Sequence, residues 1–382
     1  MTARLPVLGA ILLFCMLLAP PPVTGNEPTT LTDDLSTGSL QQAVNHSLNY
    51  LRRQPPERTF QLCNGLYDNG WLLASLENFA ALLDRHGDTT PEFVQQIQQQ
   101  FTICSGDDRS NLLVTGYYEP EVAGSLTRTA TYRYPLYRVP ADLVTRNGHV
   151  GRMDNGRLTP YWSRREIEEE NKLQGLELVY LADPVDCFIL HVQGSGRIRL
   201  PDGTSRRVHF AAKNGRPYRS IGRLLINEGK MTREEVTMPS LRAYLAAHPQ
   251  EVARVLRYNQ SFIFFNWGGA AATPSGSLGE PLTAGRSVAL DQSCYPAGAL
   301  GYLLSQKPQL NTNGEITSWL PMARFVLNQD SGSAIKGANR LDLFWGSDRY
   351  AEIAAGNMKQ PGKLYFLIKK QRHADNQQRG QL

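Results

Sequence analysis

Apolar residues in the first part of the chain recur at the spacing of amphipathic helices. The three stripes are Leu40, Val44, Leu48 and Leu51; Leu72, Leu76, Phe79 and Leu83; and Phe93, Ile97 and Phe101. Thr90 and Pro91 fit the N-cap and the first turn of the third helix. The pattern therefore predicts three helices whose apolar faces form a core and not a functional site.

From Asn111 onward the apolar period shortens toward two, and short runs of β-branched or aromatic residues alternate with Gly, Pro and Asp. Strands are predicted at 113–118, 131–139, 187–193, 197–200, 208–212, 261–265, 287–290, 324–327, 340–344 and 363–368. Helices are predicted around 221–225, over 241–258 with a break near Pro249, and over 348–355 between Ser347 and Gly356. Many short strands favour β-barrels over a doubly wound parallel sheet.

The N-terminus has the pattern of a secretion signal. Arg4 precedes an apolar run of about 15 residues, which is shorter than the roughly 20 that a spanning helix needs. A step of small residues follows, so we expect cleavage after residue 25 and a protein that works outside the cytoplasm. Cys15 is an alternative acylation site, but the bulky residues before it disfavour a lipid anchor.

Size and composition narrow the class of protein. Removing 25 of 382 residues leaves 357, so two domains are expected. The net charge is +5, and because acidic and basic residues are interspersed, no nucleic-acid partner is predicted. The histidines and cysteines show no metal-ligand spacing, so neither a metal nor another cofactor is expected. Cys63 and Cys104 flank one helical segment and are the favoured disulfide pair.

One stretch concentrates chemical groups, DSGSAIKGANRLDLFWG from Asp330 to Gly346. Partial burial of Asp330 at a strand end would raise the pKa of its carboxyl group and suit it to act as a general acid. The alternative is that Asp330 only forms a turn and Asp342 only pairs with a neighbouring base. Ser333 and Lys336 also match the S-x-x-K pattern of serine acyl-enzymes, but the companion S-D-N and K-T-G motifs are missing.

Five ordered segments resemble the membrane-bound lytic murein transglycosylase A family. They are 115–120 (TGYYEP), 191–196 (HVQGSG), 259–265 (NQSFIFF), 281–287 (PLTAGRS) and 330–346. Five motifs in order are much more specific than any one of them. The resemblance covers about 115–368 and is loose over the N-terminal helices.

The resemblance implies a mainly β fold with helices (α+β). A double-psi β-barrel domain would comprise residues 26–119 and 260–370, with a second β-rich domain, 120–259, inserted and a glycan groove between the two. Residues 1–25 would be the signal peptide and 371–382 a flexible tail. The expected compartment is the periplasm, with peripheral association with the outer membrane or with other murein enzymes as an option. The expected state is a monomer.

The implied activity is that of a lyase which cuts the β-1,4 bond between N-acetylmuramic acid and N-acetylglucosamine of peptidoglycan and leaves 1,6-anhydromuramoyl ends. The position that matches the family's catalytic acid is Asp330. Because the sugar's own C6 hydroxyl attacks C1, one carboxyl group can act first as acid and then as base. Asp342 would support it, and the substrate-binding candidates are Thr115, Tyr117, Tyr118, Glu119, Gln193, Ser195 and Lys336. The alternative function is a barrel that binds peptidoglycan without cutting it.

Overall fold

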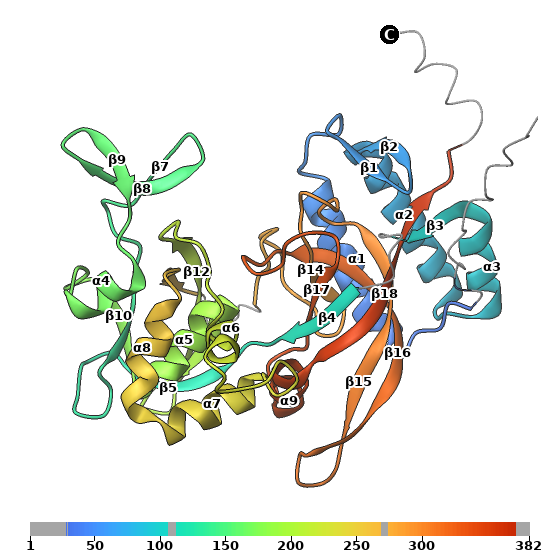
Figure 1. Ribbon diagram of the computed structural model, residues 1–382. Helices are drawn as coiled ribbons and strands as arrows, with labels where there is room; N and C mark the ends of the chain where they lie inside the picture. Colours follow the sequence, from blue (N-terminus) through green and yellow to red (C-terminus); the bar gives the residue numbers. More distant parts are fainter. Residues whose placement is uncertain (1–27, 29, 106–111, 269–273, 372–382) are drawn as a thin grey trace, which may run out of the picture.

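The computed structural model describes residues 28, 30–105, 112–268 and 274–371 (Figure 1). The predicted signal peptide and all but the first residue of the predicted tail lie outside these residues. Within the described part, no helix has the length and apolar character to cross a membrane.

The N-terminal part is helical, as the stripes predict, but Phe101 of the third stripe lies after the helix and begins strand β3 (Phe101–Ser105). It comprises α1 (Thr37–Leu51), α2 (Asn69–His86) and α3 (Pro91–Gln100), with a hairpin of β1 (Thr59–Leu62) and β2 (Gly65–Asp68) between the first two helices. The side chain of Asp68 accepts a hydrogen bond from Trp71 N and caps α2, and Thr90 caps α3 in the same way at Phe93 N. The apolar faces of the helices are buried in one core with the C-terminal strands, where the Phe79 and Phe325 rings lie 5.2 Å apart.

The C-terminal strands and β4 form a closed barrel (Figure 1). The hydrogen-bonded order is β15-β16-β14-β17-β4-β18, and β18 pairs with β15 to close the ring of six strands, while β3 lies outside it against β18. The strands are β3 (Phe101–Ser105), β4 (Leu112–Tyr117), β14 (Ser287–Ala289), β15 (Leu300–Leu310), β16 (Ile316–Asp330), β17 (Arg340–Phe344) and β18 (Lys359–Lys369), with α9 (Arg349–Asn357) before the last. The predicted class, helices combined with a β-barrel, is confirmed.

Between β4 and β14 the chain forms a second β-rich unit with its own core. Its six-stranded sheet has the order β13-β12-β11-β5-β10-β6, from β5 (Glu121–Ser125), β6 (Tyr134–Tyr137), β10 (Glu177–Leu181), β11 (Ser195–Arg199), β12 (Ser205–Lys213) and β13 (Ile263–Trp267). A three-stranded sheet of β7 (Val144–Arg146), β8 (His149–Asp154) and β9 (Arg157–Pro160) extends from it, as Figure 1 shows. Helices α4 (Arg164–Glu169), α5 (Pro184–Gln193), α6 (Ile221–Asn227), α7 (Met238–Ala247) and α8 (Val252–Tyr258), with the short 3-10 helix η1 (Pro249–Glu251), complete the unit.

Several element predictions need correction. Residues 187–193 are not a strand but the main part of α5, which Asp183 caps, Pro184 begins and Gly194 ends in the left-handed region at φ 80°. In a short apolar run, the spacing of apolar residues cannot distinguish a buried helix from a buried strand. Only the capping residues at its ends indicate a helix here. The last helix is capped by Asp348 and not by Ser347, and it continues past Gly356. Strand β13, predicted to belong with the barrel, pairs with β12 of the inserted unit.

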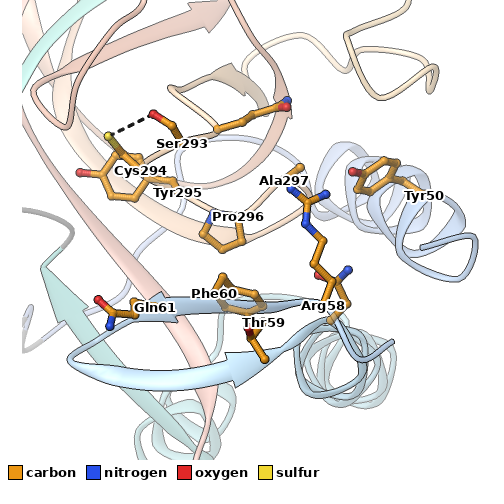
Figure 2. A pocket seen from close by; sticks show the side chains of 12 residues that line it. Tyr50, Arg58, Thr59, Phe60, Gln61, Ser293, Cys294, Tyr295, Pro296 and Ala297 are labelled. Atoms are coloured by element: carbon orange, nitrogen blue, oxygen red, sulfur yellow. Dashed lines mark hydrogen bonds between the residues drawn. The ribbon is translucent and has the colours of Figure 1, made fainter. Parts of the chain in front are cut away.

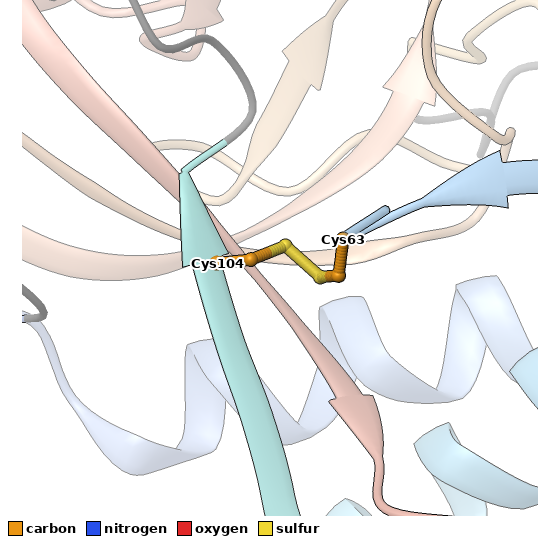
Figure 3. Close-up of a disulfide and its surroundings, with 2 residues drawn as sticks. All are labelled: Cys63 and Cys104. Atoms are coloured by element: carbon orange, nitrogen blue, oxygen red, sulfur yellow. A yellow bond between two sulfur atoms is a disulfide. The ribbon is translucent and has the colours of Figure 1, made fainter. Parts of the chain in front are cut away.

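The predicted disulfide is present. Cys63 follows β1 of the hairpin and Cys104 lies in β3, so the bond fastens the hairpin to the strand at the barrel's edge (Figure 3). Cys187 is a buried free thiol and Cys294 an exposed one.

Candidate active site

Two carboxylates lie on strands that share one neighbour in the barrel wall. Asp330 is the last residue of β16 and Asp342 lies in β17, and both face Ala289 of β14 in the strand register. Thr115 of β4 is the register partner of Asp342 on the other side. The fold therefore brings together residues that are separated by up to 227 positions in the sequence.

Asp330 is surrounded by hydrogen-bond donors. Its Oδ1 accepts from the backbone N of Ser277 and of Ser331, each at 2.8 Å, and its Oδ2 accepts from the Tyr117 hydroxyl at 2.9 Å. Burial raises the pKa of the Asp330 carboxyl, while these three donors oppose the rise. Donors to an ionised carboxylate stabilise its charged form, so the local geometry favours ionised Asp330.

Asp342 has a different environment. One side-chain donor, the Thr115 hydroxyl at 2.8 Å, bonds its Oδ1. Burial raises the pKa of Asp342 to about 6, and the charge of Asp330 also raises it. The Thr115 hydrogen bond and the charge of Arg340 lower it. Of the two carboxyl groups, Asp342 has fewer donors that stabilise a negative charge, and it is the better suited to hold a proton near neutral pH.

Tyr117 lies between Asp330 and the buried ring of Phe344. Its ring lies 5.2 Å from the ring of Phe344, and its hydroxyl donates to Asp330. Burial, the Asp330 charge and the hydrogen bond together raise the pKa of Tyr117 well above its usual value. The hydroxyl therefore stays protonated and remains a donor to Asp330.

The loop between β16 and β17 is held by a third carboxylate. Asp291 Oδ2 accepts from the backbone N of Gly337 at 2.8 Å, where the φ of 78° favours glycine. This bond, those from Ser293 and the charge of nearby Lys336 lower the pKa of Asp291 to about 2. The exposed Lys336 thus lies on the loop that connects the strands of the two carboxylates, near Asp291.

Two of the other predicted binding residues, Tyr118 and Gln193, bond to each other where the barrel meets the inserted unit. Gln193 Oε1 accepts from the backbone N of Tyr118 at 3.2 Å, and Ser195, half-buried, begins β11. The Tyr118 side chain is buried, and its hydroxyl contacts Glu352 at 3.4 Å. These contacts tie the two units together.

Glu119 lies in the same junction, but its carboxylate is fully covered. It forms ion pairs with Arg207 and, at 3.4 Å, with Arg197, and its side chain has 0% exposure. A carboxylate that is covered and paired in this way is not available to a sugar hydroxyl, so we do not place Glu119 among the residues that contact substrate.

Sequence analysis missed three residues that shape the site. Ser277 supplies a backbone donor to Asp330, Asp291 holds the loop, and Gln329 is fully buried beside Asp330. Asp291 had a signal, because it follows the predicted strand 287–290 directly. Ser277 had none, since a backbone donor leaves no trace in the residue type.

Two family models match the chain. The MltA specific insert domain matches residues 113–266 and the 3D domain matches residues 286–368. These ranges cover the inserted unit with β4 and most of the barrel, including the strands that carry Asp330 and Asp342.

Curated relatives and solved structures agree with these matches. The Escherichia coli K12 protein named membrane-bound lytic murein transglycosylase A is 30% identical over 344 residues, 90% of this chain and 85% of the relative. A Vibrio cholerae protein of the same name is 33% identical over 275 residues, 70% of this chain and 68% of the relative.

Two solved structures share the fold. A membrane-bound lytic murein transglycosylase from Agrobacterium tumefaciens has a TM-score of 0.71 at 32% identity and covers 88% of this chain and 97% of its own. E. coli MltA with bound chitohexaose has a TM-score of 0.70 at 28% identity and covers 91% and 93%. The chain therefore belongs to the membrane-bound lytic murein transglycosylase A family.

Proposed function

We propose that this protein is a lytic transglycosylase that cuts the β-1,4 bond between N-acetylmuramic acid and N-acetylglucosamine of peptidoglycan without water. The observation that carries the proposal is the half-buried pair of carboxyl groups, of which Asp342 has fewer hydrogen-bond donors and is the better suited to hold a proton. Family membership supports peptidoglycan as the substrate, and one solved relative holds chitohexaose, a chitin oligosaccharide. The relatives are named membrane-bound, which supports a place at the periplasmic side of a membrane.

In the proposed reaction, the C6 hydroxyl of the muramoyl unit attacks its own C1, and the bond from C1 to the leaving O4 breaks. Asp342 gives its proton to O4, and the carboxylate that results takes the proton from the C6 hydroxyl. Atoms balance without a water molecule, and the product is a 1,6-anhydromuramoyl end. Intramolecular attack needs no second reactant to be bound, so the site mainly orients the sugar.

This assignment exchanges the roles that the sequence alone suggested for the two aspartates. Asp330, bonded by Ser277, Ser331 and Tyr117, is proposed as the ionised neighbour. Burial is the main cause of the raised pKa of Asp342, and the negative charge of Asp330 adds to it. The same charge stabilises positive charge that develops at C1 in the transition state. Thr115 orients the Asp342 carboxyl through its hydroxyl.

Two isosteric variants test the roles. Asp342→Asn removes the proton donor and should lower release of soluble fragments from purified sacculi by at least about 10³-fold. Asp330→Asn keeps the donor but removes the charge, and should lower release by about 10- to 100-fold. Near wild-type release by Asp342→Asn, with unchanged thermal unfolding, would remove Asp342 from the proposed role.

The alternative of a barrel that binds glycan without cutting it is separated by the same assay. A wild-type protein that sediments with sacculi but releases no fragments would support it. The serine acyl-enzyme alternative would instead predict covalent labelling of Ser333 by a β-lactam, and in the structure Ser333 is an exposed loop residue.

A further inference from the structure

A polar pocket lies apart from the carboxylate pair, between the β1–β2 hairpin, α1 and the segment 292–297 (Figure 2). Its volume is about 460 Å³, within the range of roughly 300–1,000 Å³ that is common for small-ligand sites. Arg58, Gln61, Gln292, Ser293 and the rings of Tyr50 and Phe60 are among its lining residues. We call it the Arg58 pocket.

The charge of the Arg58 pocket favours an anionic ligand. Arg58 is its one charged lining residue, and no lining residue is acidic. Among the residues that the structure describes, no carboxylate forms an ion pair with the Arg58 guanidinium, whereas nearby Arg52 and Arg53 each have one. Figure 2 shows the Arg58 side chain directed from the hairpin toward Ala297, on the side of the pocket where Tyr50 lies. A guanidinium in this position suits a carboxylate.

Two hydrogen bonds link a lining residue of the Arg58 pocket to Asp330. Gln292 lines the pocket, and its Nε2 donates to Ser277 Oγ at 3.1 Å. The backbone N of the same Ser277 donates to Asp330. A peptide of four residues spans up to about 13 Å when extended, so a stem can contact residues well beyond the sugar to which it is attached.

We propose that the Arg58 pocket binds the terminal carboxylate of a peptide stem on the glycan strand, with Arg58 as its counter-ion. The inference rests on the proposed function, because the stem is a part of peptidoglycan. The side-chain amides of Gln61 and Gln292 suit peptide carbonyls, and the rings of Tyr50 and Phe60 suit aliphatic side chains. The protein then distinguishes glycan that carries peptide from glycan stripped of it.

Cys294 offers a direct test, because it lines the pocket and is an exposed free thiol. Cys187 is buried, and Cys63 and Cys104 are bonded to each other, so iodoacetamide should alkylate Cys294 first. The probes are a disaccharide with a four-residue stem that ends in a free carboxylate and the same molecule as its terminal amide. The free carboxylate should slow alkylation of Cys294 at least fivefold, and the amide should not.

Two matched variants locate the contact. Arg58→Gln should abolish the protection, and Arg52→Gln, which removes an equal charge outside the pocket, should retain it. The preference in kcat/KM for peptide-bearing over stripped glycan should fall about tenfold in Arg58→Gln and stay unchanged in Arg52→Gln. Equal protection by acid and amide, or protection that survives Arg58→Gln, would overturn the proposal.

Cys294 protection and glycan cleavage are separate measurements, so they distinguish a wrong pocket proposal from a wrong proposed function. In Asp342→Asn, protection of Cys294 should persist while cleavage is lost. Release of anhydro products without protection would refute the pocket and leave the function. Protection without cleavage by the wild-type protein would refute the function and leave the pocket.

Discussion

At the scale of residues, the two aspartates differ by what bonds them and not by their type. Three donors reach Asp330, two of them backbone N–H groups, and one hydroxyl reaches Asp342. The sequence predicted both aspartates, Thr115 and Tyr117 as site residues, and the fold brings these four together. The sequence alone could not show which aspartate holds a proton, because the backbone donor at Ser277 comes from a loop 53 residues away from Asp330.

The pKa of Asp342 predicts how activity depends on pH. The pKa lies at about 6, raised from 3.8, so the protonated acid is lost as pH rises through that value. The kcat/KM for glycan strands should therefore fall about tenfold per pH unit above about 6. A profile measured from pH 4 to pH 9 on solubilised strands would check this.

Asp330→Asn is the control for the pH profile. Removing the Asp330 charge removes one cause of the raised pKa of Asp342, so the alkaline limb of the residual activity should move to lower pH. Thr115→Val removes the hydrogen bond that lowers the same pKa and should move the limb to higher pH. An alkaline limb that stays in place in both variants would contradict the assignment.

At the scale of elements, helix α1 positions the strand end that carries Asp330. Gln329 is fully buried, and its Nε2 donates to Ala43 O at 2.7 Å and to Ser47 Oγ at 3.0 Å in α1. Its Oε1 accepts from Ser287 Oγ of β14 at 2.6 Å. One amide therefore joins a helix and two strands beside the site.

Replacing this amide should cost stability. Gln329→Ala leaves three buried polar partners without their bond, so we expect a loss of about 3 kcal/mol in the free energy of unfolding, measured by urea denaturation. Gln95→Ala, at an exposed position of α3, should change it by less than about 0.5 kcal/mol. Equal effects of the two substitutions would show that Gln329 does not join these elements.

Hydrophobic periodicity predicted the elements unevenly. The N-terminal helices were found because each carries an amphipathic stripe over several turns and clear caps. Helix α5 was mistaken for a strand because five consecutive residues, 187–191, are buried, so no face of it is polar enough to show a helical period. Strand β15 was missed because it mixes buried and half-buried positions without alternation.

At the scale of the whole molecule, the barrel is built from distant parts of the chain. β4 lies between β17 and β18, and the inserted unit leaves after β4 and returns before β14. Local patterns predicted strands and barrels but could not predict this order, because pairing between strands more than 200 residues apart leaves no periodic signal. The family resemblance implied an inserted domain that ends at residue 259. In the structure the inserted unit also includes β13, which pairs with β12.

The most direct test of the proposed function is the mass of the released products. The mature protein is incubated with purified sacculi in water enriched in ¹⁸O, and the soluble muropeptides are analysed by mass spectrometry. The proposed reaction predicts fragments with 1,6-anhydromuramoyl ends and no ¹⁸O at C1, since the C6 hydroxyl is the nucleophile. Fragments that carry one added water with ¹⁸O at C1 would show hydrolysis and contradict it.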